Sequence, residues 1–249
     1  MKCKIIRLKD VELSEKHAQD CLEQALGFDL DAELFDAING FEYQEHITTL
    51  GITPKLEAFR AKENKLGIYG CFLSHYYLWK QCYKENVPYL ILEHDGYMIR
   101  PLPEDILDTF EDVLTLDRHD PYSVIYEELL ELDNKLSYQT YPYFNHQIKK
   151  WKTELNGTGN HLRGAYAYII KPNAASRLVN WVKKHGFLPA DHQIGSAVVE
   201  IRMVVPSLAR LHPAYYGKIN EMSLTQNLET LMYSPDSSLP EWTVNMLDR

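Results

Sequence analysis

Apolar and polar positions along the chain follow two periods, which predict strands that alternate with helices. Short apolar or alternating runs predict strands over 4–8, 34–38, 89–92, 124–126, 164–170 and 201–205. Apolar residues at helical spacing predict helices over 14–26, 71–85, 105–114 and 172–184. Strands and helices in this order indicate an α/β fold with a mostly parallel central sheet.

Individual residues mark where some of these elements should begin and end. Ser14 suits the N-cap of the first helix, and Gly27 suits its end. Pro172 suits the first turn of the last helix, because its missing N–H is not needed there. We expect residues 188–192 to form a loop, and the tail beyond Tyr216 shows only weak periodicity.

The segment from Tyr89 to Asp95 carries the clearest chemical signal. Its apolar part predicts a buried strand, and Glu93, His94 and Asp95 follow at the carboxyl end. Ligands of open α/β sheets bind just outside the carboxyl ends of the strands. Two carboxylates and an imidazole there could bind a divalent cation, which in turn could bind a phosphate-bearing substrate. The alternative is a surface turn that simply ends the strand.

Composition and charge narrow the class of protein. The chain has 249 residues, of which 45% are hydrophobic, as in an ordinary globular protein. Its net charge of -9 argues against a broad non-specific nucleic-acid surface. The four cysteines lack C-x-x-C spacing, which favours buried thiols in a reducing compartment. We find no signal peptide and no apolar run near the ~20 residues that span a bilayer, and therefore expect a soluble, cytoplasmic protein.

Three segments of the chain carry motifs of a known family. They are Phe35–Gly40, Gly67–Trp79 with Leu90–Asp95 following it, and Gly164–Ala175 with Asp191 beyond it. In these segments the chain resembles glycosyltransferase family 25, the group that contains lipooligosaccharide and collagen galactosyltransferases. The run G-I-Y-G-C-F-L-S-H-Y-Y-L-W at 67–79 is the most specific of the three. Two departures stand out, since Ile68 replaces a glutamate and His94 replaces the middle acid of the family's triplet.

The resemblance implies a fold and an activity. It covers roughly residues 2–215, so we expect a GT-A-like nucleotide-sugar-binding domain over 1–215 and a tail over 216–249 that packs on it or extends it. The implied reaction moves a hexose from a UDP-sugar, UDP-galactose or UDP-glucose, to a hydroxyl of a glycan acceptor, with inversion and with Mn²⁺ or Mg²⁺. Two alternatives stay open: transfer to a modified base in DNA, and a non-catalytic relative that only binds a sugar nucleotide. The sequence leaves the oligomeric state open.

The resemblance also assigns binding roles. Asp95 is the expected direct metal ligand, and His212 is a second one, although a histidine before proline also suits a turn. Ser74, His75 and Glu93 are further expected donor-binding residues. Arg7, Leu8, Asn39 and Gly40 are expected to line a nucleotide pocket because of their position at the ends of the first two predicted strands. Ser74 and His75 have an alternative role as a hydrogen-bonded pair that satisfies buried backbone groups. His94 alternates with its neighbours on the strand, so we expect its side chain to point away from theirs.

An inverting transfer needs a general base that takes the proton from the acceptor hydroxyl. Asp191 is the expected base, because the resemblance places its loop on the acceptor side, and Glu200 and Asp120 are further options. The alternative for Asp191 is the N-cap of a helix over 194–199.

Overall fold

The structure is a computed structural model that describes residues 1–59, 65–117, 138–143, 157–212 and 214. Its centre is a seven-stranded sheet with the order β2-β1-β3-β7-β5-β8-β6. The strands are β1 (Lys2–Arg7), β2 (Ala32–Asp36), β3 (Tyr89–Glu93), β5 (Val113–Thr115), β6 (Gln139–Pro142), β7 (Ala167–Ile170) and β8 (Ile201–Val205). A second sheet pairs β4 (Gly96–Met98) with β9 (Ala209–Leu211).

The predicted mostly parallel sheet is confirmed for the described part of the chain. β1 pairs in parallel with β2 and β3, and β5 pairs in parallel with β8. β7 lies between β3 and β5 and is antiparallel to both, so β3 and β5 point the same way. β6 is antiparallel to β8 at the edge. Five strands therefore share one direction, which is consistent with a GT-A-like domain.

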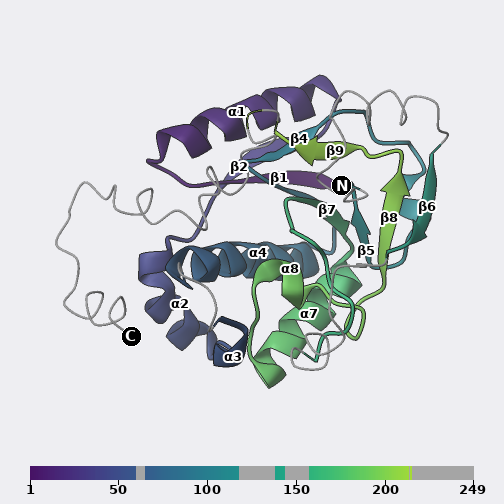
Figure 1. Ribbon diagram of the computed structural model, residues 1–249. Coiled ribbons are helices and arrows are strands. Elements are labelled where there is room, and N and C mark those ends of the chain that lie inside the picture. Colours follow the sequence, from purple (N-terminus) through teal and green to yellow (C-terminus); the bar gives the residue numbers. More distant parts are fainter. Residues whose placement is uncertain (60–64, 118–137, 144–156, 213, 215–249) are drawn as a thin grey trace.

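Helices cover both faces of the sheet (Figure 1). α1 (Glu12–Gly27) covers one face, and α4 (Lys65–Glu85) and α7 (Pro172–His185) cover the other. Shorter helices lie beside α4 and α7: α2 (Tyr43–Leu50), α3 (Leu56–Phe59) and α8 (Ala190–Gln193). Two single turns of 3-10 helix are η1 (Gly40–Glu42) and η2 (Ile106–Asp108). No helix in the described part of the chain is long and apolar enough to cross a membrane.

The sheet separates two hydrophobic cores, because successive strand residues point to opposite faces. In β3, Tyr89 and Ile91 pack in the core under α4 and α7. Leu90 and Leu92 pack in the core under α1. All four are fully buried, which explains why this strand reads as a continuous apolar run. The same alternation decides which helix the polar residues after Leu92 will face.

Most predicted elements are present, with shifted ends. The strands predicted at 4–8, 34–38, 89–92, 164–170 and 201–205 correspond to β1, β2, β3, β7 and β8, and the helices at 14–26, 71–85 and 172–184 to α1, α4 and α7. The predicted strand at 124–126 and the tail at 216–249 lie outside the described residues. The division between a domain at 1–215 and that tail therefore stays a prediction.

The predicted helix over 105–114 is wrong. Residues 106–108 form only the single turn η2, and Val113–Thr115 form the buried strand β5. β5 lies between β7 and β8 and exchanges backbone hydrogen bonds with both. Two neighbouring strands thus override the local helical spacing, and the β-branched residues Val113 and Thr115 suit the result.

Two expectations about element boundaries are also wrong. Ser14 does not cap α1, because it lies inside the helix and its hydroxyl accepts a hydrogen bond from the Leu8 N–H at 2.8 Å. Val11 occupies the N-cap position instead. Residues 188–192 are not all loop, since the short helix α8 begins at Ala190.

Candidate functional site

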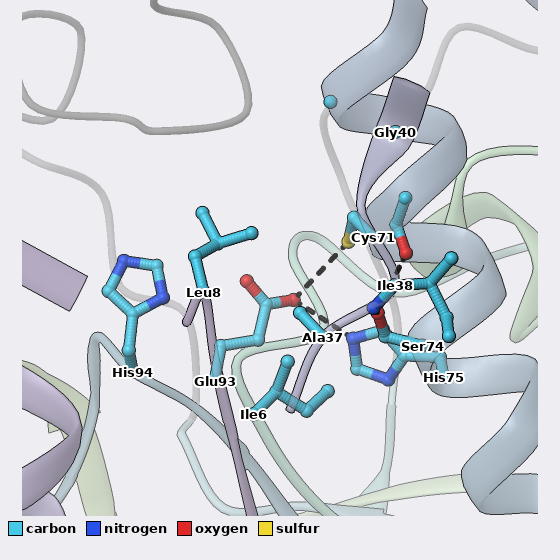
Figure 2. Close-up of a pocket in the computed structure, with 12 residues that line it drawn as sticks. Ile6, Leu8, Ala37, Ile38, Gly40, Cys71, Ser74, His75, Glu93 and His94 are labelled. Atoms are coloured by element: carbon cyan, nitrogen blue, oxygen red, sulfur yellow. Dashed lines mark hydrogen bonds and ion pairs between the residues drawn. The ribbon is translucent and has the colours of Figure 1, made fainter. Parts of the chain in front are cut away.

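A pocket opens at the carboxyl ends of three adjacent parallel strands, β1, β2 and β3 (Figure 2). Ile6 of β1 and Leu8, which follows β1, line it, and Glu93 lines it from the end of β3. Ala37 and Ile38, which follow β2, complete this side of the wall. The pocket is therefore at the sheet edge where α/β proteins bind ligands.

Helix α4 forms the opposite wall with one face. Its lining residues follow the spacing of a single helix face and are Gly67, Gly70, Cys71, Ser74 and His75. This is the segment that carries the most specific sequence motif. Sequence reasoning named Ser74 and His75 as site residues but not Cys71, although Cys71 shares their helix face. The predicted pocket residues Leu8, Gly40 and Glu93 also line this cavity.

Two of the predicted donor-binding residues lie outside the pocket lining. The Arg7 guanidinium forms an ion pair with Asp36, with Nε 2.8 Å from Oδ1. The Asn39 side chain accepts a hydrogen bond from the Phe41 N–H at 3.0 Å and so caps η1. Both side chains are engaged within the protein, and neither is among the residues that line the cavity.

The pocket walls are held together by Ser74. Its hydroxyl donates to the Gly70 carbonyl at 2.7 Å and accepts from the Ile38 N–H at 2.9 Å. It therefore joins α4 to the segment after β2, as the structural alternative for this residue predicted. Gly40 has a comparable packing role, since a Cβ atom there would lie 2.1 Å from the Leu66 carbonyl oxygen. The backbone that approaches Gly40 most closely is thus that of α4.

Glu93 faces α4 and contacts two of its residues. His75 Nε2 lies 3.1 Å from Glu93 Oε1, and Cys71 Sγ lies 3.8 Å from the same oxygen. Figure 2 shows both contacts converging on that one oxygen. The donor atoms of Cys71, His75 and Glu93 all lie within 4.8 Å of one another. In the described part of the chain they form the group of side chains whose spacing suits a metal ion.

The charges of three predicted site acids act on the pKa of the Cys71 thiol. Burial is the main cause that raises the pKa of Cys71 well above its usual value. The carboxylates of Glu93, Asp191 and Asp95 raise this pKa further, in that order. These acids come from β3, α8 and the turn after β3, so the fold brings residues about 100 positions apart in sequence to one region.

Asp95 has the features of a cation ligand. Its Oδ1 atom is buried and has no hydrogen-bond partner among the residues that the structure describes. Burial, and after it the Glu93 carboxylate, raises the pKa of Asp95. An unpaired buried carboxylate oxygen is costly, and a divalent cation would satisfy it. This residue therefore fits the metal that the sequence implied.

His212 fits that metal less well. Its backbone N–H donates to the Asp95 carbonyl at 2.7 Å, so the two residues are adjacent. Its imidazole, however, stacks on His17 of α1 with the ring centroids 4.3 Å apart, and its Nε2 lies 3.3 Å from Asp20 Oδ2. The His212 imidazole therefore contacts residues of α1. To bind a metal beside Asp95, it would have to leave these partners.

His94 points away from Glu93, as the strand alternation predicted. In Figure 2 the His94 imidazole and the Glu93 carboxylate lie on different sides of Leu8. His94 is buried, and burial lowers its pKa to about 4; the Glu93 carboxylate opposes this shift, and His17 and His212 add to it. The residue that replaces the family's middle acid is thus a buried, neutral imidazole that also lines the pocket.

The predicted general bases fall in different places. Asp191 lies in the first turn of α8, which packs beside α4, and its Oδ1 accepts from the His192 N–H at 3.0 Å. Residues 194–199 form no helix, so the alternative role of Asp191 as the N-cap of such a helix is wrong. Glu200 precedes β8 and is exposed at the amino end of that strand, at the sheet edge opposite Glu93. Asp120 lies outside the described residues.

Two comparisons relate the chain to known glycosyltransferase and lipooligosaccharide biosynthesis proteins. A sequence model of glycosyltransferase family 25, described as an LPS biosynthesis protein family, matches residues 2–194. The chain is also similar to the lipooligosaccharide biosynthesis protein lic2B of Haemophilus influenzae, with 23% identity over 175 residues. That match covers 70% of this chain and 60% of the relative's length. Because the family match spans most of the chain, including both pocket walls and α8, the protein belongs to glycosyltransferase family 25.

Proposed function

We propose that this glycosyltransferase moves a hexose from a UDP-sugar to a hydroxyl of a glycan, with inversion and with the help of a divalent cation. The observation that carries the proposal is the pocket at the ends of β1, β2 and β3, near the buried Asp95 Oδ1, which has no hydrogen-bond partner among the described residues. A nucleotide diphosphate sugar needs an apolar surface for its base, acceptors for its ribose hydroxyls and a cation for its phosphates. The described residues supply the first two and one ligand for the third.

Each wall of the pocket has a role in donor binding. Ile6, Leu8 and Ile38 offer the apolar surface against which a base can pack. Glu93 uses Oε1 for its contacts with α4, which leaves Oε2 for a ribose hydroxyl. Asp95 would hold Mn²⁺ or Mg²⁺, and such a cation would neutralise the negative charge that develops on the leaving diphosphate.

The acceptor side of the reaction is assigned to α8. The acceptor oxygen attacks the anomeric carbon, the bond between that carbon and the diphosphate oxygen breaks, and its electron pair leaves with UDP. The proton of the attacking hydroxyl passes to a carboxylate oxygen of Asp191. Support for this role comes from the position of Asp191 in α8, which packs beside the pocket-lining helix α4. The name of the Haemophilus relative supports a lipooligosaccharide glycan as the acceptor.

Nucleotide-sugar binding and sugar transfer test the proposal separately. We expect UDP-galactose or UDP-glucose to raise the melting temperature with Mn²⁺ present, and a chelator to reduce the shift, since a bound ligand stabilises the native state. We expect transfer to lipooligosaccharide-type glycans and none to duplex DNA carrying a hydroxymethylated base. Transfer to the DNA would establish the alternative acceptor. Binding without transfer to any acceptor or to water would indicate a non-catalytic relative, and the absence of binding by every UDP-sugar would refute the proposed donor.

A further inference from the structure

A continuous chain of hydrogen bonds runs from the protein core to the pocket. The Trp79 indole Nε1 lies 2.8 Å from the Tyr168 hydroxyl, and this hydroxyl lies 2.8 Å from His75 Nδ1. His75 Nε2 then lies 3.1 Å from Glu93 Oε1 at the pocket wall. Trp79, Tyr168 and His75 are all fully buried, so water does not compete for these bonds. Trp79 and His75 belong to α4 and Tyr168 to β7, and His75 and Glu93 both line the pocket.

The donors and acceptors of these side chains determine which atom donates in each hydrogen bond. An indole N–H can only donate, so the Tyr168 oxygen accepts from Trp79. The Tyr168 O–H must then find an acceptor of its own, and among the described residues the one within reach is His75 Nδ1. Nδ1 accepts only when it carries no proton, which places the imidazole proton on Nε2. Nε2–H therefore donates to Glu93, and all four groups are satisfied.

We propose that Tyr168 and Trp79 are positioning residues for the donor site: they fix the tautomer of His75, and His75 in turn orients the Glu93 carboxylate. The His75 bond, with the Cys71 thiol beside it, engages Oε1 and leaves the second oxygen of Glu93 for the ligand (Figure 2). In one respect this inference rests on the proposed function, namely that the ligand of Glu93 is a nucleotide sugar. The tautomer of His75 follows from the protein alone.

The same geometry argues against a metal ion bound by Cys71, His75 and Glu93, despite the spacing of their donor atoms. A metal would need the lone pair of Nε2, and the imidazole proton would then move to Nδ1. The Tyr168 O–H would lose its acceptor in a fully buried position. The position of one proton thus distinguishes a positioning chain from a metal site.

Nitrogen NMR of the protein labelled with ¹⁵N-histidine tests the tautomer directly. The His75 ring is assigned by nuclear Overhauser contacts to the rings of Tyr168 and Trp79. We expect Nε2 to carry the proton in the wild-type protein, with or without added Zn²⁺. Protonated Nδ1, or coordination of Zn²⁺ through Nε2, would overturn the proposal. This measurement requires no substitution and no nucleotide sugar.

Substitution of Tyr168 tests whether its hydroxyl fixes the tautomer of His75. In Tyr168→Phe we expect part of the His75 population to carry its proton on Nδ1, because Nδ1 has lost its donor and only the bond to Glu93 still favours Nε2–H. Tyr76→Phe is the matched control, since Tyr76 is another fully buried tyrosine on the α4 side, and its hydroxyl has no hydrogen-bond partner among the described residues. We expect it to leave the His75 spectrum unchanged. A spectrum equally unchanged in Tyr168→Phe would show that Tyr168 does not set the tautomer.

A double-substitution cycle tests whether Tyr168 affects UDP-sugar binding through Glu93. We expect Tyr168→Phe to weaken UDP-galactose binding and to raise its KM by roughly 10-fold, as is typical for residues that orient a ligand-binding group, with kcat little changed. Combined with Glu93→Gln, it should add nothing, because both changes remove the same oriented oxygen. Additive effects would mean that Tyr168 acts by another route. If the wild-type protein binds no UDP-sugar, the proposed function fails, and the tautomer of His75 still decides the positioning chain.

Discussion

Gly70 of α4 packs directly against the backbone that follows β2: a Cβ atom built on it would lie 2.6 Å from the Ile38 carbonyl oxygen and 2.9 Å from the Gly40 nitrogen. The absence of side chains at Gly70 and Gly40 lets the two pocket walls meet. Replacing a glycine by alanine usually stabilises a helix. At Gly70 we expect this substitution to lower the stability of the protein instead.

We expect Gly70→Ala to destabilise the protein by ~1–3 kcal/mol, since overpacking against backbone outweighs the gain of ~1 kcal/mol in helix propensity. Gly27→Ala in α1 is the matched control, because a Cβ atom there meets nothing within 4 Å. It should be neutral or stabilising by up to ~1 kcal/mol. Urea unfolding measures both. Equal stabilisation by the two substitutions would mean that the walls do not pack as closely as described.

Asp95→Asn should separate activity from stability. It removes a buried carboxylate whose Oδ1 has no protein partner in the described residues, so the melting temperature should stay the same or rise. Sugar transfer should fall by at least ~100-fold, because even residues one step removed from a metal cost 10–100-fold when replaced. The transfer assay is run across a range of Mn²⁺ concentrations. Full activity at low Mn²⁺ would rule out Asp95 as the cation ligand.

Asp191 and Glu200 offer a paired test of the general base. Asp191→Asn should lower kcat by ~10²–10⁴-fold with little change in donor affinity, as expected for loss of proton transfer. Glu200→Gln should leave kcat unchanged, since Glu200 lies at the amino end of β8. Its carboxylate forms an ion pair with Arg202, with Oε1 3.6 Å from Nη1. Steady-state kinetics with both substrates measure the two variants. A loss in Glu200→Gln equal to that in Asp191→Asn would contradict the assignment.

Cys71 should be the thiol that alkylates in the native protein. It is half-buried, whereas the other three cysteines are buried: Cys3, Cys21 and Cys82. Its raised pKa keeps the thiolate scarce at neutral pH, so alkylation by iodoacetamide should be slow at pH 7 and accelerate as the pH rises. Mass spectrometry identifies the modified residue and its rate.

Two controls sharpen the cysteine experiment. UDP-galactose should protect Cys71, because this residue lines the proposed donor pocket. Glu93→Gln should accelerate alkylation at a given pH, because it removes the nearest carboxylate that raises the pKa of the thiol. Modification of Cys82 before Cys71, or no effect of the nucleotide sugar, would count against the location of the pocket.

Local spacing predicted the strand of one pocket wall and the helix of the other from Cys71 onward. The residues of 67–75 that line the pocket recur at intervals of three and four, so any helix places them on one face. The apolar run at 89–92 predicts a buried strand, and the period of two predicts that Glu93 and His94 diverge. Both predictions depend only on the geometry of a single element. The pocket forms where those elements meet.

Contacts between distant segments decide features that short spacing cannot predict. β5 is a strand because β7 and β8 pair with it, although its local pattern suggested a helix. The His212 ring packs on α1 through contacts with His17 and Asp20, which lie almost 200 residues earlier. Glu200 has the chemistry of a base but begins its strand at the far sheet edge. In each case the deciding partner is remote in sequence.

The sequence by itself determined the family, the alternation of strands and helices, and the polar groups at the end of β3, because these depend on residue type and short spacing. Only the tertiary structure decided which of those groups work together. The Tyr168 hydroxyl is 93 residues from His75 in sequence, and it meets Nδ1 because β7 pairs with β3 beneath α4. A hydrogen bond needs its two atoms about 3 Å apart, and for remote residues only the folded chain sets that distance.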